Sequence, residues 1–508
     1  MKKTIIDYFE STVEKYPQNI AVADKKNQLT YQQLSDNSKN IACHIAENGI
    51  RKKPVALFMK RSVSLPAAMM SVLYSGNFYV VLDFESPQQR IEKILNTLSP
   101  AMIIYETEFK DKVYEFDENI IKLNFEEAKE NDKTDDAVIE AIKSKTTSGD
   151  PAYALFTSGS TGVPKGALLT NLNVISYIHW FIKCFNIDSN TVFGSQTSLY
   201  FSMSVSDFYG SMFTGAAYNI IPKEYFAFPA KLIDFMNERK IDTIYWVPSA
   251  LGMVAKFNLF KYCLPNSLKR VLFAGEVMPV KYLNYWKRYF PDVMYANLFG
   301  PTETTDICTY YVVNRDFDET QSIPIGLPCD NCEAFIVDND GKEVLDDSIG
   351  ELYVNSPFVA SGYFGNKEKT DEVFVQNPLH NDYIEKVYKT GDLVRRNEYG
   401  ELEYIGRKDF QIKHLGYRIE PSEIETVLNT VENVELTVCI YDSNSDSLIL
   451  AYESQKNIDS ELKEAALKLL PHYMQPSFFK HFSIFPKNAN GKIDRKEIAK
   501  IILENERG

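Results

Sequence analysis

Short apolar runs alternate with longer amphipathic stretches along most of the chain. Runs such as "VALFM", "AMIIYE", "TIYWVPS" and "RVLFAGE" have the length of buried strands, and stretches with helical periodicity separate them. This alternation predicts an α/β domain from the N-terminus to about Gly406. From about Lys408 the order changes to strand, helix, two strands and helix, which predicts a small α+β unit. We therefore place a large domain at 1–407 and a small one at 408–508.

Composition narrows the class of protein. A chain of 508 residues exceeds one ordinary domain, and 44% hydrophobic with 24% charged residues is typical of a globular protein. The net charge of −14 argues against nucleic acid or an anionic membrane as the main partner. No stretch reaches the ~20 apolar residues of a membrane span, and the first residues lack the pattern of a signal peptide. The seven scattered cysteines suit reduced thiols, so we expect a cytoplasmic enzyme.

One cysteine pair has the spacing of metal-binding and redox sites. Cys329 and Cys332 form a C-x-x-C pattern in "PCDNCE". A structural zinc site needs four ligands, and no second pair accompanies this one. The pattern therefore favours a turn ahead of the strand candidate "EAFIVD".

A glycine-rich segment, "LFTSGSTGVPKGALLT" from Leu155 to Thr170, lies between a strand candidate and a helix candidate. Backbone N–H groups approach an anion closely only where side chains are absent, so this arrangement predicts a phosphate site. A P-loop needs its lysine directly after glycine and directly before Ser or Thr. Lys165 instead follows Pro164 and precedes Gly166, which excludes that pattern. The segment predicts anion binding of another kind.

The segment resembles the phosphate-binding signature of the adenylate-forming superfamily, which includes acyl-CoA synthetases, luciferases and peptide-synthetase adenylation domains. Six further segments match in the family's order: "LTYQQL", "YVVLDFESPQQRI", "NLFGPTET", "YKTGDLVRR", "EYIGRKDFQIKHLGYRIEPSEIE" and "NANGKIDR". They span almost the whole chain. The sequences of the last two segments are most similar to those of amino-acid adenylation domains of nonribosomal peptide synthetases and of D-alanine–carrier-protein ligase. The resemblance implies a large α/β domain and a small mobile α+β domain that swings about Asp409.

The same resemblance implies ATP and Mg²⁺ as cofactors and assigns residues to them. Glu303 would bind magnesium, Asp392 would bind the ribose hydroxyls with help from Arg407, and Phe299 would stack on adenine. Lys492 would bridge the substrate carboxylate and a phosphate oxygen, so we expect Lys492, Thr157 and Glu303 to be catalytic. The full set implied for ATP is Thr157, Ser158, Gly159, Ser160, Thr161, Gly162, Lys165, Asn297, Phe299, Gly300, Thr302, Asp392 and Arg407.

A second half-reaction is implied, in which the activated acid passes to a thiol. The segment His414–Arg418 matches the part that lines the pantetheine tunnel, with Gly416 allowing close approach. Free coenzyme A is a possible acceptor, but the amino-acid-type motifs favour the phosphopantetheine arm of a carrier protein. Only 16 residues follow Lys492, so we expect a separate carrier.

The predicted acid pocket departs from the family. Amino-acid-activating members carry Asp where this chain has Ser202, and that Asp binds the α-ammonium of the substrate. Asp207 would lie in a following helix and away from the pocket. Asp306 either is a solvated turn residue or faces the pocket, and the sequence leaves both open. The pocket positions are Ser202, Met203, Ser206, Trp246, Leu272, Ala274, Leu298, Asp306 and Ile307.

We therefore expect a ligase that adenylates a carboxylic acid and loads it onto a separate carrier protein. An aryl acid of the hydroxybenzoate type, or another acid without a standard α-ammonium, is the leading substrate. Loading of D-alanine or another amino acid is an alternative, and an acyl-CoA synthetase is a second. An inactive scaffold protein is a third, which intact Lys165, Glu303, Asp392 and Lys492 oppose.

Overall fold

The computed structural model describes residues 3–159, 163–408, 411–442, 445–486 and 493–505. The chain forms two compact units. The first contains residues 1–82, 98–155 and 166–408, and the second contains 83–97, 156–165 and 409–508.

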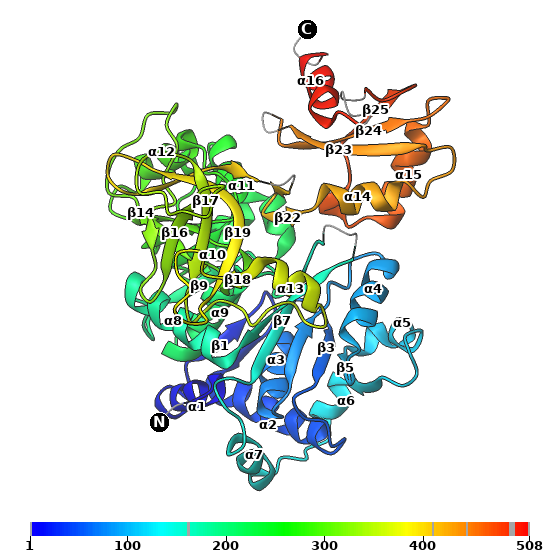
Figure 1. Cartoon of the computed structure of the whole chain (residues 1–508). Coiled ribbons are helices and arrows are strands. Elements are labelled where there is room, and N and C mark those ends of the chain that lie inside the picture. The colour runs from blue at the N-terminus through cyan, green and yellow to red at the C-terminus, as the bar shows by residue number, and fades with distance from the viewer. Residues whose placement is uncertain (1–2, 160–162, 409–410, 443–444, 487–492, 506–508) are drawn as a thin grey trace. The chain divides into compact units, whose positions relative to one another are not determined.

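A nine-stranded sheet forms much of the first unit (Figure 1). Its strands, in spatial order, are β15 (Leu327–Pro328), β14 (Thr309–Val312), β13 (Met294–Phe299), β12 (Arg270–Phe273), β11 (Thr243–Trp246), β9 (Val192–Ser195), β10 (Ala217–Ile220), β1 (Ile20–Ala23) and β2 (Gln28–Thr30). The six strands from β13 to β1 are parallel, whereas β14, β15 and β2 are antiparallel at the edges. Ligand sites of such sheets lie at the carboxyl ends of the parallel strands.

Two further sheets contain the other strands before residue 408. A six-stranded sheet has the order β6 (Ile121–Asn124), β5 (Met102–Tyr105), β3 (Pro54–Phe58), β4 (Phe78–Val81), β7 (Pro151–Thr157) and β8 (Lys165–Thr170). An antiparallel sheet has the order β16 (Glu333–Val337), β17 (Gly350–Asn355), β19 (Lys386–Arg396) and β18 (Phe374–Gln376), with β20 (Leu402–Arg407) also paired to β19. The helices are α1 (Ile5–Lys15), α2 (Tyr31–Ala46), α3 (Ser64–Tyr74), α5 (Lys110–Tyr114), α6 (Phe125–Glu130), α7 (Asp136–Lys143), α8 (Asn171–Phe185), α9 (Ser204–Thr214), α10 (Pro229–Glu238), α11 (Pro248–Lys256), α12 (Val280–Tyr289) and α13 (Lys367–Val373).

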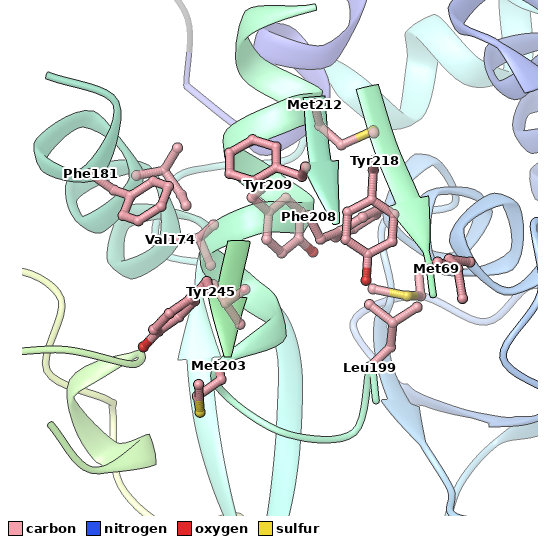
Figure 2. Packing of buried hydrophobic residues seen from close by; sticks show 14 of the residues in the cluster. Met69, Val174, Phe181, Leu199, Met203, Phe208, Tyr209, Met212, Tyr218 and Tyr245 are labelled. Carbon is pink, nitrogen blue, oxygen red and sulfur yellow. The ribbon is translucent and has the colours of Figure 1, made fainter. Parts of the chain in front are cut away.

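Helices α8 and α9 pack on each other in the core and later supply site residues. Thr170 caps α8, because its hydroxyl accepts from the backbone N–H of Asn173 while the Asn173 side chain bonds back to the cap. Figure 2 shows aromatic side chains of α9 among those of α8 and β10. The Tyr209 hydroxyl reaches the Tyr79 hydroxyl of β4 at 2.8 Å, so α9 connects the two parallel sheets. These buried contacts fix the start of α9.

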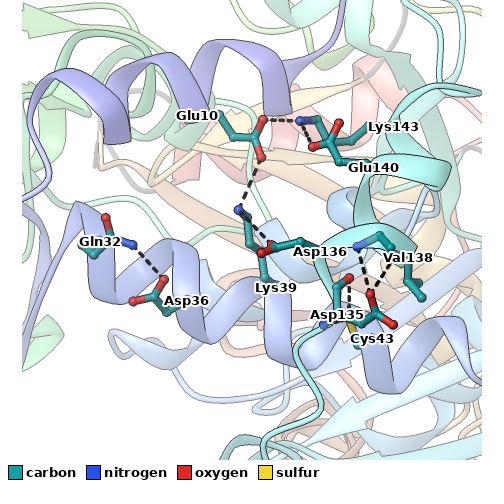
Figure 3. A network of polar contacts seen from close by, with 11 residues as sticks. Glu10, Gln32, Asp36, Lys39, Cys43, Asp135, Asp136, Val138, Glu140 and Lys143 are labelled. Atoms are coloured by element: carbon teal, nitrogen blue, oxygen red, sulfur yellow. Dashed lines mark hydrogen bonds and ion pairs between the residues drawn. The ribbon is translucent and has the colours of Figure 1, made fainter.

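The N-terminal helices are linked by charged side chains (Figure 3). Lys143 of α7 pairs with Glu10 of α1 and with Glu140, 2.8 Å away. Lys39 of α2 lies 3.8 Å from Glu10 and 3.7 Å from Asp136. Partly exposed ion pairs contribute little stability, so this network mainly orients three helices whose apolar faces are buried.

The second unit is α+β, as the sequence predicts. Its sheet has the order β23 (Leu436–Asp442), β24 (Ser447–Glu453) and β25 (Phe478–Phe482), and a separate hairpin pairs β21 (Ile412–His414) with β22 (Tyr417–Ile419). Its helices are α4 (Gln88–Leu98), α14 (Pro421–Leu428), α15 (Asp459–Leu469) and α16 (Arg495–Asn505). Leu415 and Gly416 both have positive φ in the two-residue hairpin turn, which suits glycine at the second position. The sequence did not predict β25 and α16.

The end of the chain is anchored inside the second unit. Arg495, at the start of α16, forms two hydrogen bonds with the carboxylate of Glu425 in α14, one of them 2.8 Å long. The same carboxylate accepts from the backbone N–H of Cys439 in β23 at 2.8 Å. A single buried acid thus connects a helix, a strand and the last helix.

Candidate active site

Strand register divides the predicted site residues between two faces of the nine-stranded sheet. Tyr245 of β11 pairs with Leu272 of β12, which pairs with Ala296 of β13. The next residues along each strand, Trp246, Phe273 and Asn297, pair with one another in the same way. Paired residues of parallel strands share a face and successive residues alternate. One face therefore carries Tyr245, Leu272 and Leu298, and the other carries Trp246, Asn297 and Phe299.

The second of these faces carries the residues that the resemblance assigned to adenine. The Asn297 amide donates to the carbonyl of Pro324 at 2.8 Å. The ring of Phe299 lies 5.6 Å from that of Tyr404 in β20, tilted by 43°. An aromatic ring and a fixed amide are groups that bind a flat base by stacking and by hydrogen bonding.

Asp392 and Arg407 are cross-strand partners on β19 and β20. Arg407 Nη1 lies 3.2 Å from Asp392 Oδ1 and donates to the carbonyl of Thr390 at 2.7 Å. Gly391 has φ of +75°, which favours glycine, and a Cβ added there would lie 2.6 Å from Arg407 Nη2, so another residue would displace this guanidinium. Asp392 Oδ1 is buried and accepts no hydrogen bond from the described part of the chain. Such an acceptor is suited to a hydroxyl from a ligand.

Glu303 lies in the 3₁₀ turn η4 (Thr302–Thr304) and is fully buried. The Tyr363 hydroxyl donates to Glu303 Oε1 at 2.5 Å, and the Glu303 carbonyl accepts from the backbone N–H of Ala360 at 2.8 Å. A buried carboxylate held in this way has the donor chemistry that Mg²⁺ prefers. Thr302 Oγ1 lies 3.4 Å from Ser202 Oγ, so the predicted phosphate and acid residues are neighbours here.

The glycine-rich loop contributes described residues only at its two ends. Thr157 Oγ1 is buried and has no hydrogen-bond partner in the described structure. Ser158 Oγ donates to the carbonyl of Arg418 at 2.6 Å. A Cβ on Gly159 would lie 2.0 Å from the Val163 carbonyl oxygen, so the loop is too tight there for any side chain. Lys165 is buried at the start of β8.

Five predicted residues lie outside the described structure. They are Ser160, Thr161 and Gly162 of the loop, the expected hinge residue Asp409, and Lys492. Their assignments remain predictions from the resemblance.

Asp306 is buried at the centre of a cluster of hydroxyl groups and is not solvated. Its Oδ2 atom accepts from Ser206 Oγ of α9 at 2.6 Å, from the Tyr177 hydroxyl of α8 at 3.1 Å and from the Tyr245 hydroxyl of β11 at 3.2 Å. The side chain of Asp306 is 1% exposed. Three elements that are distant in sequence thus converge on one carboxylate oxygen, which excludes the alternative of a solvated turn residue.

Gly300 allows the loop bearing Asp306 to pack closely. A Cβ at Gly300 would lie 2.4 Å from the Asp306 carbonyl oxygen and 2.5 Å from the Ile307 Cα, both backbone atoms. The backbone cannot yield as a flexible side chain would, so glycine is required. The glycine of the "GPTE" segment therefore fixes the place of Asp306.

Burial and hydrogen bonding act in opposite directions on Asp306. Burial raises the pKa of the Asp306 carboxyl to about 6, against the lowering effect of Ser206, Tyr177, Tyr245 and Ser202. The Asp306 carboxyl therefore ionises at a higher pH than an ordinary aspartate. These four partners are all neutral hydroxyls, so they solvate the charge without balancing it.

Trp246 is a correction to the predicted pocket. Its indole N–H donates to the Gly194 carbonyl at 2.8 Å, and its ring packs edge-on against Phe226 at 5.1 Å. It lies on the face of β11 opposite to Tyr245, whose hydroxyl bonds to Asp306. Tyr245 and Tyr177 were not among the predicted residues. The alternation within "TIYWVPS" signals that one of Tyr245 and Trp246 faces away, but not which one.

The remaining predicted pocket positions are mostly buried. Ser202 is partly exposed just before α9, and Asp207 lies within α9, as expected. Burial raises the pKa of Asp207 to about 7, against the lowering effect of Ser195 and Arg61, so Asp207 has different partners from Asp306. The buried positions are Met203, Ser206, Leu272, Ala274, Leu298 and Ile307.

Cys329 and Cys332 form a turn. The Cys332 N–H donates to the Cys329 carbonyl at 3.0 Å between β15 and β16, and both are free cysteines. Burial raises the pKa of both thiols. Within the described ranges, no group of three or more His, Cys, Asp or Glu side chains is arranged to hold a metal ion. No described helix has the length and apolar character needed to cross a membrane.

The α/β core carries Asn297 and Phe299 on one sheet face, the buried Glu303 in a turn, and a tight glycine-rich loop. These features together are those of an enzyme that activates carboxylates with a nucleotide. The chain belongs to the family of AMP-binding enzymes, whose pattern matches residues 9–364. Within that family it is an adenylation domain of the nonribosomal peptide synthetase type. The predicted family and fold are thereby confirmed.

Individual relatives are similar to this chain in sequence or in structure over nearly its full length. Zwittermicin A synthase ZmaJ of Bacillus cereus is 30% identical over 519 residues, which cover 98% of this chain and 95% of ZmaJ. The Vibrio cholerae adenylation domain AlmE, solved with glycyl-adenosine-5'-phosphate, has a TM-score of 0.85 at 19% identity and covers 99% and 98% of the two chains. Holo-PA1221, described as containing adenylation and PCP domains, has a TM-score of 0.82 at 20% identity, covering 98% and 84%.

Other relatives are much longer proteins. The chain is 31% identical over 504 residues to gramicidin S synthase 2 of Brevibacillus brevis, which covers 98% of this chain but 11% of that synthase.

Proposed function

We propose that the protein is an ATP-dependent ligase that adenylates an amino acid and transfers it to the phosphopantetheine thiol of a separate carrier protein. The observation that carries this proposal is the buried Asp306 carboxyl, which accepts from Ser206 and from Tyr245 on the sheet face opposite to Asn297 and Phe299. The membership in the peptide-synthetase class supports the reaction type. The PCP domain of PA1221 supports a carrier protein as the partner.

The described residues that are predicted to bind ATP have side chains suited to its adenine, ribose and phosphates. Asn297 and Phe299 would hold adenine, and Asp392 with Arg407 would hold the ribose, where Asp392 Oδ1 has an unused acceptor. The buried Thr157 Oγ1 is a second polar atom without a partner in the described structure, as a phosphate ligand would require. Ser158, Gly159, Ser160, Thr161, Gly162, Lys165, Gly300 and Thr302 complete the set carried over from the resemblance.

The chain's own groups would neutralise charge and fix geometry. The substrate carboxylate attacks the α-phosphorus of ATP, an acyl–phosphate bond forms, and pyrophosphate leaves with the electron pair. Two anions meet in this step, so Lys165 and Lys492 would lower its barrier by offsetting negative charge. Mg²⁺ held at Glu303 would supply further charge neutralisation at the phosphates. In the second step a carrier thiol replaces AMP on the acyl carbon.

The residues on the sheet face that carries Tyr245 favour an amino acid over an aryl acid as the substrate. An aryl pocket was expected to include Trp246, which faces away, while the polar groups Tyr177, Tyr245 and Ser206 surround Asp306. A phenol would offer Asp306 one more neutral donor. An ammonium would offer it the opposite charge, which a buried carboxylate needs more. AlmE, solved with a glycyl adenylate, is also consistent with an amino acid.

Pyrophosphate exchange with the full chain tests this function. The panel should contain common α-amino acids, β- and γ-amino acids, hydroxybenzoates and simple fatty acids. We expect exchange with at least one amino acid and transfer to a phosphopantetheinylated carrier in preference to coenzyme A. Exchange with hydroxybenzoates alone would support the aryl-acid alternative. If a folded protein that binds ATP shows no pyrophosphate exchange with any acid, the proposal is contradicted.

A further inference from the structure

We infer that Asp306 is the counter-charge for the amine of the substrate and that this amine lies beyond the α-carbon, as in a β- or γ-amino acid. The inference rests on the proposed function, because it concerns the acid that the same site adenylates. It depends on where Asp306 lies relative to Ser202.

The two positions differ in depth. Ser202 is partly exposed and precedes α9, whereas Ser206, four residues later, is fully buried. Asp306 Oδ2 accepts from Ser206 Oγ at 2.6 Å, whereas Ser202 Oγ lies 3.4 Å from Thr302 Oγ1. The negative charge therefore lies deeper than position 202, where the family's α-ammonium partner was expected.

The surroundings of Asp306 favour a cationic ligand. Tyr177 and Tyr245 are both fully buried, so the carboxylate is shielded from bulk water on those sides. The Tyr177 hydroxyl also lies 2.7 Å from Ser206 Oγ, so the donors are linked and hold the carboxylate in one orientation. A buried ionised carboxylate with only neutral partners is costly unless a cation joins it. A substrate ammonium would complete the site.

The location is built into the backbone. Gly300 lets the Asp306 backbone pack at a distance that no other residue allows, and Thr305, next to Asp306, has φ of +67°. Positive φ in a β-branched residue is strained and persists only where the surroundings require it. The backbone is thus held so that this carboxylate points toward the hydroxyls of α8, α9 and β11.

Matched pairs of acids isolate the amine. β-Alanine and butyrate have nearly the same shape, as do 4-aminobutyrate and pentanoate, and each pair differs only in ammonium against methyl. We expect the wild-type enzyme to prefer an amine over its methyl partner at least about tenfold in kcat/KM for pyrophosphate exchange. Asp306→Asn should abolish this preference, so that the ratio of kcat/KM for the amine over its methyl partner falls to about one.

Asp207→Asn is the matched control, because Asp207 is a second buried carboxylate, located on α9, and none of the hydroxyls that bond to Asp306 bonds to it. It should keep the preference for the amine. Calorimetric binding of the sulfamoyl-adenosine analogues of β-alanine and butyrate gives the same comparison without turnover. Binding of the β-alanine analogue should fall at least about tenfold in Asp306→Asn.

Ser202→Asp is a second variant that does not depend on the folding of Asp306→Asn. It returns a carboxylate to the shallower position and should raise the use of an α-amino acid over β-alanine at least about tenfold. A wild-type preference for α-amino acids, or an amine preference that survives Asp306→Asn, would overturn the inference and leave the proposed function intact. If no acid supports pyrophosphate exchange, both the inference and the proposed function are contradicted.

Discussion

Tyr245 and Trp246 are adjacent in β11, yet the Tyr245 hydroxyl bonds to Asp306 while the Trp246 indole bonds to the Gly194 carbonyl on the other face. The same alternation continues through β12 and β13, where Leu298 shares a face with Tyr245, and Asn297 shares a face with Trp246. One set of strands therefore presents one face to the proposed acid and the other to the proposed nucleotide. This division leads to a direct test.

Tyr245→Phe should weaken use of the acid, whereas Trp246→Phe should not change which acid is used. Tyr245 donates to a charged group, and a lost bond of that kind costs about 1.5–3 kcal/mol, which corresponds to about tenfold or more. The increase should appear in KM for the acid and not in KM for ATP. Trp246→Phe should lower the melting temperature through lost packing and a lost hydrogen bond. Equal effects of the two changes on acid KM would contradict the register-based assignment.

Asp306→Asn should stabilise the ligand-free protein at neutral pH. Burial raises the pKa of Asp306 in the folded state to about 6, above the ordinary value for aspartate, so the folded state binds this proton more tightly than the unfolded state. Its contribution to stability is present below about pH 4 and is lost as pH rises through about 6. The raised pKa corresponds to about 3 kcal/mol, and the altered hydrogen bonds reduce the expected gain to about 1–3 kcal/mol.

Urea unfolding at pH 5 and pH 7.5 measures that gain. The groups facing Asp306 are Tyr177, Tyr245 and Ser206, with Asp207 and Tyr153 coupled to it by charge. The tyrosine pKa values are raised by burial, so these hydroxyls stay neutral in this range. The advantage of Asp306→Asn should therefore be larger at pH 7.5 than at pH 5. A variant less stable than wild type at both pH values would mean that the carboxylate is a structural requirement.

Thr157→Val should separate stability from catalysis. The buried Thr157 hydroxyl has no hydrogen-bond partner in the described structure, so an isosteric apolar side chain should leave the free energy of unfolding unchanged or slightly higher. Pyrophosphate exchange should fall at least about tenfold if this hydroxyl bonds to a phosphate. Exchange at the wild-type rate in a folded variant would remove Thr157 from the proposed site.

Lys492→Ala should abolish formation of the acyl-adenylate and spare thioester formation from preformed adenylate. This prediction follows from the resemblance, in which the lysine acts on charge that develops only in the first transition state. Exchange and single-turnover loading of the carrier measure the two steps separately. Adenylation at nearly the wild-type rate would exclude the assigned role.

Sequence patterns predicted the fold class, because parallel strands with two buried faces are continuous apolar runs and the helices between them have a 3.6-residue period. They failed at β25 and α16, where "FFKHF" and the last helix lack a clear alternation. Asp306 was recognised in the sequence, but its burial was not, since it depends on Tyr177 and Tyr245 from distant elements. Trp246 was misassigned because a shift of one residue reverses the face.

The clamp between Arg495 and Glu425 makes the C-terminal helix part of the fold of the second unit. Glu425 is 6% exposed, and its carboxylate also orients the backbone of β23 at Cys439. A protease that trimmed the chain past Arg495 would leave the buried Glu425 carboxylate without its guanidinium. The loss would be smaller than the about 3–5 kcal/mol of a fully buried pair, because the Arg495 side chain is 31% exposed, but such trimming would still destabilise the second unit.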